Sequence, residues 1–191
     1  LEESLRGALE NSGEDPGSAT NMSFTSSQMT NDSVLFDSSF KPQHWSGNVT
    51  AYSMVNGKPS DKAKWVAETQ IGNQDASSRI IFTMENDSKK GSKRVFIAPT
   101  SVDALTSGEE SGLSKSQIDL LLTDLPTSIL SLDPALLPAA KLKYLQLLVN
   151  YLRGDRTSED KKTLDSVLAG KPFRKRDGVI GDIVHSTPVY G

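Results

Sequence analysis

The sequence predicts an α+β fold in which an antiparallel β-sheet is followed by a small helical segment. In the first half of the chain, residues alternate in character with a period of two, as over 49–55, which is typical of strands. The strand candidates are joined by short polar connections, which favours antiparallel pairing. After residue 106, apolar residues recur at helical spacing, most clearly at Leu142, Leu145, Val149 and Leu152.

The composition bounds the class of protein. Of the 191 residues, 36% are hydrophobic and 6% aromatic, whereas globular domains have about 45–50% apolar residues, so we expect part of the chain to lie outside a core. Lys and Arg number 21 against 24 Asp and Glu, and the net charge of -3 argues against a nucleic-acid partner. The absence of cysteine excludes disulfides, cysteine-ligated metals and thiol catalysis. No apolar run approaches about 18 residues, so we expect no transmembrane segment.

The first third of the chain divides into a helix and a linker. Residues 1–12 have apolar residues at helical spacing and end at a Ser-Gly stop, which predicts the terminal helix of a preceding domain. The chain has neither an initiator Met nor a signal-peptide pattern, and we interpret it as a piece of a longer protein. Residues 13–33 are predicted to be a flexible linker, because Ser, Thr and Asn dominate there. The alternative is a strand over 33–36 that pairs with the β region after it.

Residues 34–100 are predicted to form the antiparallel β region. The expected strands cover 49–55, 64–67, 79–84 and 94–98. Asn56-Gly57 is a strong signal for a hairpin turn. The polar run 85–91 is expected to be a second hairpin loop.

Residues 101–172 are predicted to be helical. Ser114 can cap a helix, with Gln117 completing a capping box, and Pro126 ends that helix. Asp133-Pro134 starts another helix, which Pro138 bends or restarts. Gly154 follows the last apolar residue of that helix, a usual position for a C-terminal glycine. One more short helix is expected from 158 to 168.

Arg153, Gly154 and Asp155 spell RGD and are the candidate binding residues of the chain. Integrins can read this tripeptide when it tips an exposed loop. The same residues also have structural roles available, since Gly154 can stop a helix and Asp155 can cap the next turn. Both interpretations remain open from the sequence.

Other residues do not indicate chemistry. Asp182, His185 and Ser186 combine the residue types of a hydrolase triad, but neighbours on an extended strand point in different directions and cannot converge. His44 stands alone in the sequence. We therefore expect no enzyme, and no cofactor in this chain.

The sequence gives only weak signals for a metal site, for binding of an anionic surface and for glycosylation. Neither 86–88 nor 155–160 has the alternating oxygen ligands of a calcium loop, and we expect no metal site. The basic residues of 171–176 are expected to be a solvated cluster rather than an anionic-surface site. Four sequons matter only in a glycosylating pathway; they lie at Asn21, Asn31, Asn48 and Asn86.

Three groups of segments together resemble one family. They are residues 40–52 (FKPQHWSGNVTAY) with Trp65 and Arg79-Ile80; residues 151–156 (YLRGDR) with Glu159; and residues 173–176 (FRKR) with 181–190 (GDIVHSTPVY). Their order, spacing and residue identities resemble those of the PilY family, the tip-associated adhesin and assembly factors of bacterial type IV pili. The resemblance covers roughly residues 34–191.

The resemblance implies a place in a longer protein. Residues 1–33 would end a von Willebrand A-like domain and its linker, the sheet would be blade-like, and 173–191 would be a C-terminal strand that enters a β-propeller. Calcium would bind that downstream propeller and none of the residues here.

The same resemblance implies a function. It implies type IV pilus biogenesis, twitching motility, virulence and adhesion at the pilus tip on the cell surface, outer membrane-associated or extracellular. The implied partners are minor pilins of the tip complex and host-cell receptors. The alternatives are an integrin- or matrix-binding module acting through Arg153-Gly154-Asp155, and a fragment of a quinoprotein-like propeller enzyme, which the blade-like spacing suggests.

Overall fold

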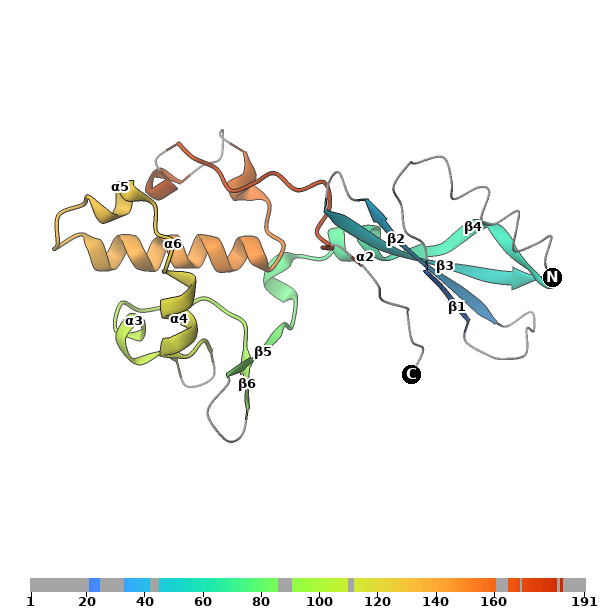
Figure 1. Ribbon diagram of the computed structural model, residues 1–191, viewed down its shortest axis with the longest axis horizontal. Helices are drawn as coiled ribbons and strands as arrows, with labels where there is room; N and C mark the ends of the chain where they lie inside the picture. The colour runs from blue at the N-terminus through green and yellow to red at the C-terminus, as the bar shows by residue number, and fades with distance from the viewer. Residues whose placement is uncertain are drawn as a thin grey trace. The chain divides into compact units, whose positions relative to one another are not determined.

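The structure is a computed structural model (Figure 1) and describes residues 21–24, 33–41, 45–85, 91–109, 112–160, 165–168, 170–181 and 183. The chain divides into two compact units. The first unit comprises Leu1–Gln74 with Arg176–Gly191, and the second comprises Asp75–Lys175. An antiparallel sheet and helices are both present, which confirms the α+β class. The helix predicted over 1–12 lies outside the described residues.

The first unit is built on one four-stranded antiparallel sheet. Its strands are arranged in the order β1-β2-β3-β4, and they are β1 (Asn21–Phe24), β2 (Val34–Lys41), β3 (Ser46–Val55) and β4 (Lys58–Val66). Strand β1 lies within 13–33, where the composition predicted a flexible linker. It pairs with the edge of β2 from Asn21↔Ser38 to Phe24↔Leu35, so the backbone of these four residues is ordered by a neighbouring strand that composition alone does not reveal. Strand β2 corresponds to the alternative prediction of a strand from residue 33 onward.

A tight turn sets the register of β3 and β4. Asn56 and Gly57 have φ angles of 52° and 75°, which is the left-handed geometry of a two-residue type I′ hairpin. The turn predicted from Asn-Gly is confirmed. Further from the turn, the pairing shifts register on both sides of Tyr52, which bends the sheet.

Among the described residues of the first unit, three apolar side chains form the core. Leu35, Ala51 and Met54 are buried, and Ala51 lies between Phe36 and Trp65 in the sheet register. The rings of Phe36 and Trp65 have centroids 5.9 Å apart, so these aromatic side chains cover the small central residue. Trp65 itself stays half-buried.

Strand β2 also carries a partly buried carboxyl group. Burial raises the pKa of Asp37, and its Oδ1 atom accepts no hydrogen bond among the described residues. Across the sheet, burial and then the charge of Asp37 raise the pKa of Tyr52. The deprotonated form of Asp37 is thus disfavoured by its surroundings.

The last described part of the chain returns to this sheet. The Gly47 N–H donates to the Ile180 carbonyl at 3.4 Å, and Ser46 forms an antiparallel bridge with Gly181. A Cβ at Gly47 would lie 2.6 Å from the Gly181 oxygen, so only glycine permits this approach. The role of 173–191 as a strand that enters a propeller stays a prediction.

The second unit begins with helical turns and a separate two-stranded hairpin. Helix α2 (Ala67–Gly72) follows β4 and still belongs to the first unit. The 3-10 turn η1 (Ala76–Ser78) is the first element of the second unit. The hairpin is β5 (Phe82–Glu85) and β6 (Ser92–Val95). Residues 34–100 therefore hold two sheets, and the hairpin belongs with the helices after it.

The remaining elements of the second unit are short except for one helix. They are α3 (Ala104–Ser107), α4 (Lys115–Leu121), α5 (Thr127–Leu130), α6 (Leu137–Leu152), η2 (Thr157–Glu159) and η4 (Ser166–Leu168). The capping box of α4 is confirmed, since the Ser114 Oγ accepts from the Gln117 N–H and the Gln117 side chain accepts from the Ser114 N–H.

The long helix begins four residues later than its Asp-Pro signal. The Asp133 carboxylate accepts from the Ala135 N–H at 2.8 Å and closes a separate turn. Pro138 then lies in the first turn of α6, where a missing N–H costs nothing. Of the two predicted roles of Pro138, to bend or to restart the helix, the structure shows the second.

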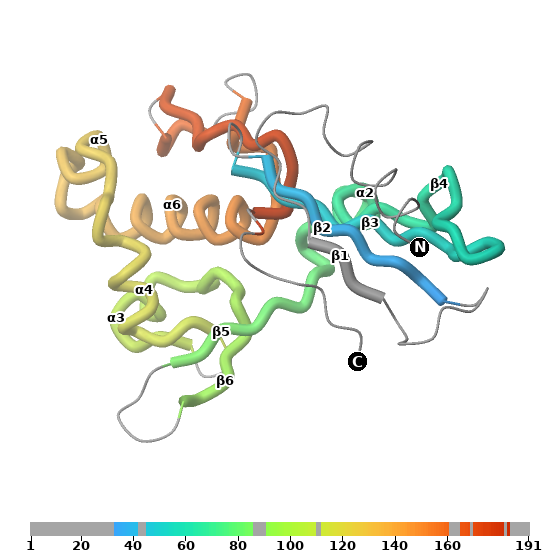
Figure 2. The backbone as a smooth tube through the Cα atoms, turned by 45° about the vertical axis from the view of Figure 1, so that its right-hand side comes forward, coloured from blue at the N-terminus to red at the C-terminus, as the bar shows by residue number. Residues whose placement is uncertain are grey.

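Helix α6 packs against two apolar clusters, with α4 on one side and the C-terminal part of the unit on the other (Figure 2). One cluster contains Leu113, Ile118, Leu145 and Val149, and the other contains Ile129, Tyr144 and Leu168. Leu152, which was expected on the buried face, is 48% exposed. The buried residues of α6 are Tyr144, Leu145 and Val149.

Candidate functional site

The RGD segment lies at the C-terminal end of α6, and its arginine points inward. Arg153 is only 5% exposed. Its guanidinium donates to four backbone carbonyls, those of Phe96 (2.6 Å), Ala76 (3.2 Å), Ser77 (3.1 Å) and Arg79 (2.6 Å). A planar guanidinium with five N–H donors suits several carbonyls at once. Arg153 thus fastens the first residues of the second unit, and the end of β6, to α6.

Gly154 permits a second arginine to approach the same helix end. Its φ is +109°, and a Cβ there would overlap the Arg79 guanidinium. The Arg79 Nη1 donates to the Arg153 carbonyl at 2.8 Å, and Arg153 donates back to the Arg79 carbonyl. The prediction that Gly154 lies just after the helix as its C-terminal glycine is confirmed.

Asp155 starts the next turn of the chain. Its N–H donates to the Asn150 carbonyl at 2.9 Å, and its Oδ1 accepts from the Thr157 N–H at 2.8 Å. An integrin ligand needs its arginine and aspartate both presented on an exposed loop, whereas Arg153 is buried here. The structure therefore favours the structural interpretation of Arg153-Gly154-Asp155 and does not support receptor binding by this tripeptide.

Sequence reasoning missed the partners of Arg153. Residues 76–79 and 96 lie 57 or more positions away in the chain, and nothing in their local pattern marks them as acceptors. The available signal for the burial of Arg153 was its place at the end of an amphipathic helix, four residues after the core residue Val149.

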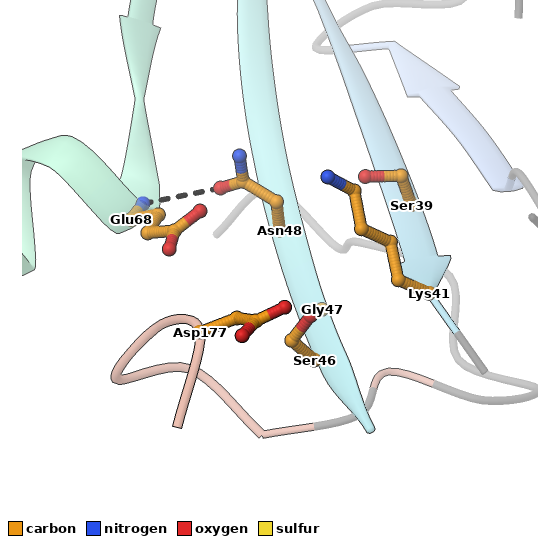
Figure 3. Close-up of a pocket in the computed structure, with 7 residues that line it drawn as sticks. All are labelled: Ser39, Lys41, Ser46, Gly47, Asn48, Glu68 and Asp177. Carbon is orange, nitrogen blue, oxygen red and sulfur yellow. Dashed lines mark hydrogen bonds between the residues drawn. The ribbon is translucent and has the colours of Figure 1, made fainter. Parts of the chain in front are cut away.

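The first unit contains a polar pocket of about 190 Å³ at one end of β2 and β3 (Figure 3). Ser39 pairs with Asn48 and Lys41 with Ser46 across the strands, so their side chains share one face of the sheet. The remaining lining residues are Gly47 of β3, Glu68 of α2 and Asp177 of the C-terminal segment.

The pocket is held in shape by one asparagine. The Asn48 Oδ1 accepts from its neighbour Val49 N–H at 2.9 Å and from the Glu68 N–H at 3.1 Å, which ties the start of α2 to β3. Figure 3 shows the Glu68 and Asp177 carboxylates on the same side of β3. The mixture of carboxylate, ammonium and hydroxyl groups can hydrogen-bond a small polar molecule. Neither Asn48 nor Glu68 was a candidate for a binding site from the sequence, because the pocket forms only when three segments meet.

Several sequence candidates fall outside the described residues, namely His44, Asp182, His185, Ser186, Asn31 and Asn86–Ser88. In the described ranges, no three Asp, Glu or His side chains gather closely enough to hold a metal ion. None of the helices that the structure describes is long and apolar enough to cross a membrane.

The basic segment 171–176 is anchored through its aromatic residue. Phe173 lies 4.8 Å from the Tyr151 ring and 6.1 Å from the Tyr144 ring, measured between centroids. The Tyr151 hydroxyl donates to the Arg174 carbonyl at 2.9 Å. Lys171, Arg174 and Lys175 are exposed around this anchor, whereas Arg176 is half-buried.

Comparison with known proteins gives one informative match. The chain is similar to a protein of Xylella fastidiosa described as "Type IV pilus biogenesis factor PilY1 homolog", with 28% identity over 162 residues. The match covers 81% of this chain and 10% of that protein, so the chain spans about a tenth of the length of this relative. No family model matches, and no solved structure matches.

Proposed function

We propose that this chain is a connecting region of a PilY-like protein that supports type IV pilus biogenesis. The observation that carries the proposal is the similarity over 162 residues to a PilY1 homolog. A match of that length includes residues of both units, since neither 1–74 with 176–191 nor 75–175 is that long. It thus extends beyond the three groups of segments that first indicated the family.

The packing of the second unit suits a connector. The chain enters this unit through 75–79, which Arg153 and Arg79 fasten to the end of α6. It leaves through 173–174, which Tyr151 of the same helix end holds by a ring contact and a hydrogen bond. Tension along the chain would therefore load contacts at one end of α6 and, through Phe173, the apolar cluster that contains Tyr144. We infer a mechanical role, with no chemical step.

The finer parts of the proposal concern the whole protein. They are a location at the pilus tip on the cell surface, minor pilins as partners, adhesion to surfaces or host cells, and calcium bound by a propeller outside this chain. Adhesion through an integrin is not part of it, because Arg153 is buried.

The proposal is tested in the bacterium that encodes the chain. An in-frame deletion of residues 33–181 should sharply reduce surface pili, measured as pilin sheared from cells, and should reduce twitching. The same deletion in a strain unable to retract its pili separates loss of assembly from unopposed retraction. Binding of the same strains to a surface tests adhesion separately. Normal piliation and twitching, with the shortened protein present at the wild-type level, would overturn the proposal.

A further inference from the structure

The β5–β6 hairpin presents an apolar outer face to solvent. Ile80, two residues before the start of β5, and Phe82 and Met84 of β5 stand at alternate positions and are 78%, 51% and 64% exposed. Alternate residues of a strand project from the same face. Opposite Phe82 in the register is Val95, which adds a fourth apolar side chain. Single exposed apolar residues are ordinary, but a contiguous stripe marks a contact surface.

The inner face of the hairpin is held against the unit by polar contacts. The Thr83 hydroxyl accepts from the Gln117 side-chain amide at 3.2 Å. Glu85 and Arg94 form an ion pair at 2.6 Å, and Arg94 also donates to the Glu109 carbonyl at 2.9 Å. These contacts fix which face points outward. The apolar stripe cannot turn inward without breaking them.

A lysine completes the outer face. Lys93 lies opposite Met84 in the register, and its Nζ is 3.6 Å from the centroid of the Phe82 ring. An ammonium group this close to a ring centroid makes a cation–π contact, so the charge of Lys93 lies on the apolar face itself. Apart from the inner Arg94–Glu85 ion pair, residues 82–95 have three bases, Lys89, Lys90 and Lys93, against one acid, Asp87, within a chain of net charge -3.

We propose that this outer face binds an anionic lipid surface. A stable protein interface uses about 20–30 residues on each side, whereas five side chains make up this face. A few apolar side chains inserted at the headgroup boundary, with basic residues above them, are sufficient for reversible membrane contact. Positive charge on this hairpin complements anionic headgroups.

The test uses the 191-residue chain and two kinds of vesicle, phosphatidylcholine alone and phosphatidylcholine mixed with phosphatidylglycerol. The chain should sediment with the anionic vesicles, and the bound fraction should fall as salt is raised, because screening weakens the charge term. Phe82→Ser with Met84→Ser should weaken binding about tenfold or more, since apolar area is lost. Lys93→Glu should weaken it about fivefold or more.

The matched control removes exposed apolar area elsewhere in the same unit. Leu130 and Leu136 are 57% and 60% exposed, and Leu130→Ser with Leu136→Ser should leave vesicle binding unchanged. Thermal unfolding identifies any variant that fails to fold. If the Phe82/Met84 serine variant does not fold, Lys93→Glu still tests the proposal, because it changes an exposed side chain.

Four outcomes would overturn the proposal. They are no binding to anionic vesicles, equal binding to neutral vesicles, an equal loss in the Leu130/Leu136 control, and a lipid-free dimer abolished by the Phe82/Met84 variant. The last would assign the face to a second copy of the chain.

Discussion

Arg153 is a charged side chain with almost no solvent contact, and its stability depends on acceptors supplied by other segments. Removing an arginine from water is costly unless its donors are satisfied. Here they are satisfied by backbone carbonyls of 76–79 and of Phe96, and those carbonyls are in turn satisfied by the arginine. The side chain therefore joins α6 to two segments that are distant in sequence.

Replacement of Arg153 should destabilise the second unit. Arg153→Ala leaves several part-buried carbonyls without donors, each costing about 1–3 kcal/mol, so we expect a loss of about 3 kcal/mol or more in the free energy of unfolding. Denaturant unfolding of the purified chain measures it. Arg174→Ala is the matched control, since Arg174 is exposed and should change stability by about 0.5 kcal/mol or less. Equal losses in the two variants would show that the carbonyl contacts contribute little.

This residue also shows what sequence analysis could not provide. The tripeptide at 153–155 was recognisable, and the helix-ending role of Gly154 came from local rules. The burial of Arg153 depends on partners up to 77 positions away, which no local pattern contains. The pocket around Asn48 has the same origin, because it needs β2, β3, α2 and the C-terminal segment together.

At the scale of elements, Gln117 joins a helix to a strand pair. Its side-chain oxygen accepts from the Ser114 N–H and completes the capping box of α4. Its amide nitrogen donates to the Thr83 hydroxyl and to the Met84 carbonyl, both at 3.2 Å. The carbonyl of Met84 faces α4 rather than β6, so this bond holds the edge of the hairpin.

Two substitutions should separate these roles. Gln117→Glu keeps an acceptor for the cap, but its carboxylate cannot donate to the Met84 carbonyl. Gln117→Ala loses both functions. We expect Gln117→Glu to lower hydrogen-exchange protection in β5–β6 while α4 keeps its protection, and Gln117→Ala to lower both, at a cost of about 1–2 kcal/mol. Unchanged protection of the hairpin in Gln117→Glu would contradict this anchoring role.

Elements set by local rules were predictable, and those set by packing were not. The Asn56-Gly57 turn and the Ser114 cap each depend on a few adjacent residues, and both are present as predicted. The buried face of α6 was predicted only in part, because Tyr144 is buried in a second cluster and Leu152, the last residue of the helix, is exposed. Helix α2 directly continues the strand predicted over 64–67, and the contact of its first turn with Asn48 lies outside any local pattern.

At the scale of the whole molecule, the second unit is an insertion into the first. The first unit uses residues before 75 and after 175, and its two parts meet where Gly47 contacts 180–181. The sequence indicated a change from strands to helices near residue 100, whereas the units separate between Gln74 and Asp75. The change in periodicity marks the end of the last strand in the sequence. The β5–β6 hairpin nevertheless belongs to the second unit, because it contacts Gln117 of α4.

An inserted unit with its own core should fold without its host. Residues 75–175 contain both apolar clusters and the Arg153 contacts, so this fragment should unfold cooperatively by circular dichroism, at a temperature close to that of the same transition in the whole chain. Calcium should not shift it. Gly47→Ala in the whole chain should lower only the other transition, because its Cβ would collide with the Gly181 carbonyl in the first unit. If the fragment instead melts without cooperativity, the contacts at the end of α6 cannot hold the unit closed by themselves, and its stability must come from the chain on either side. That result would contradict the mechanical role inferred from the contacts of Arg153 and Tyr151.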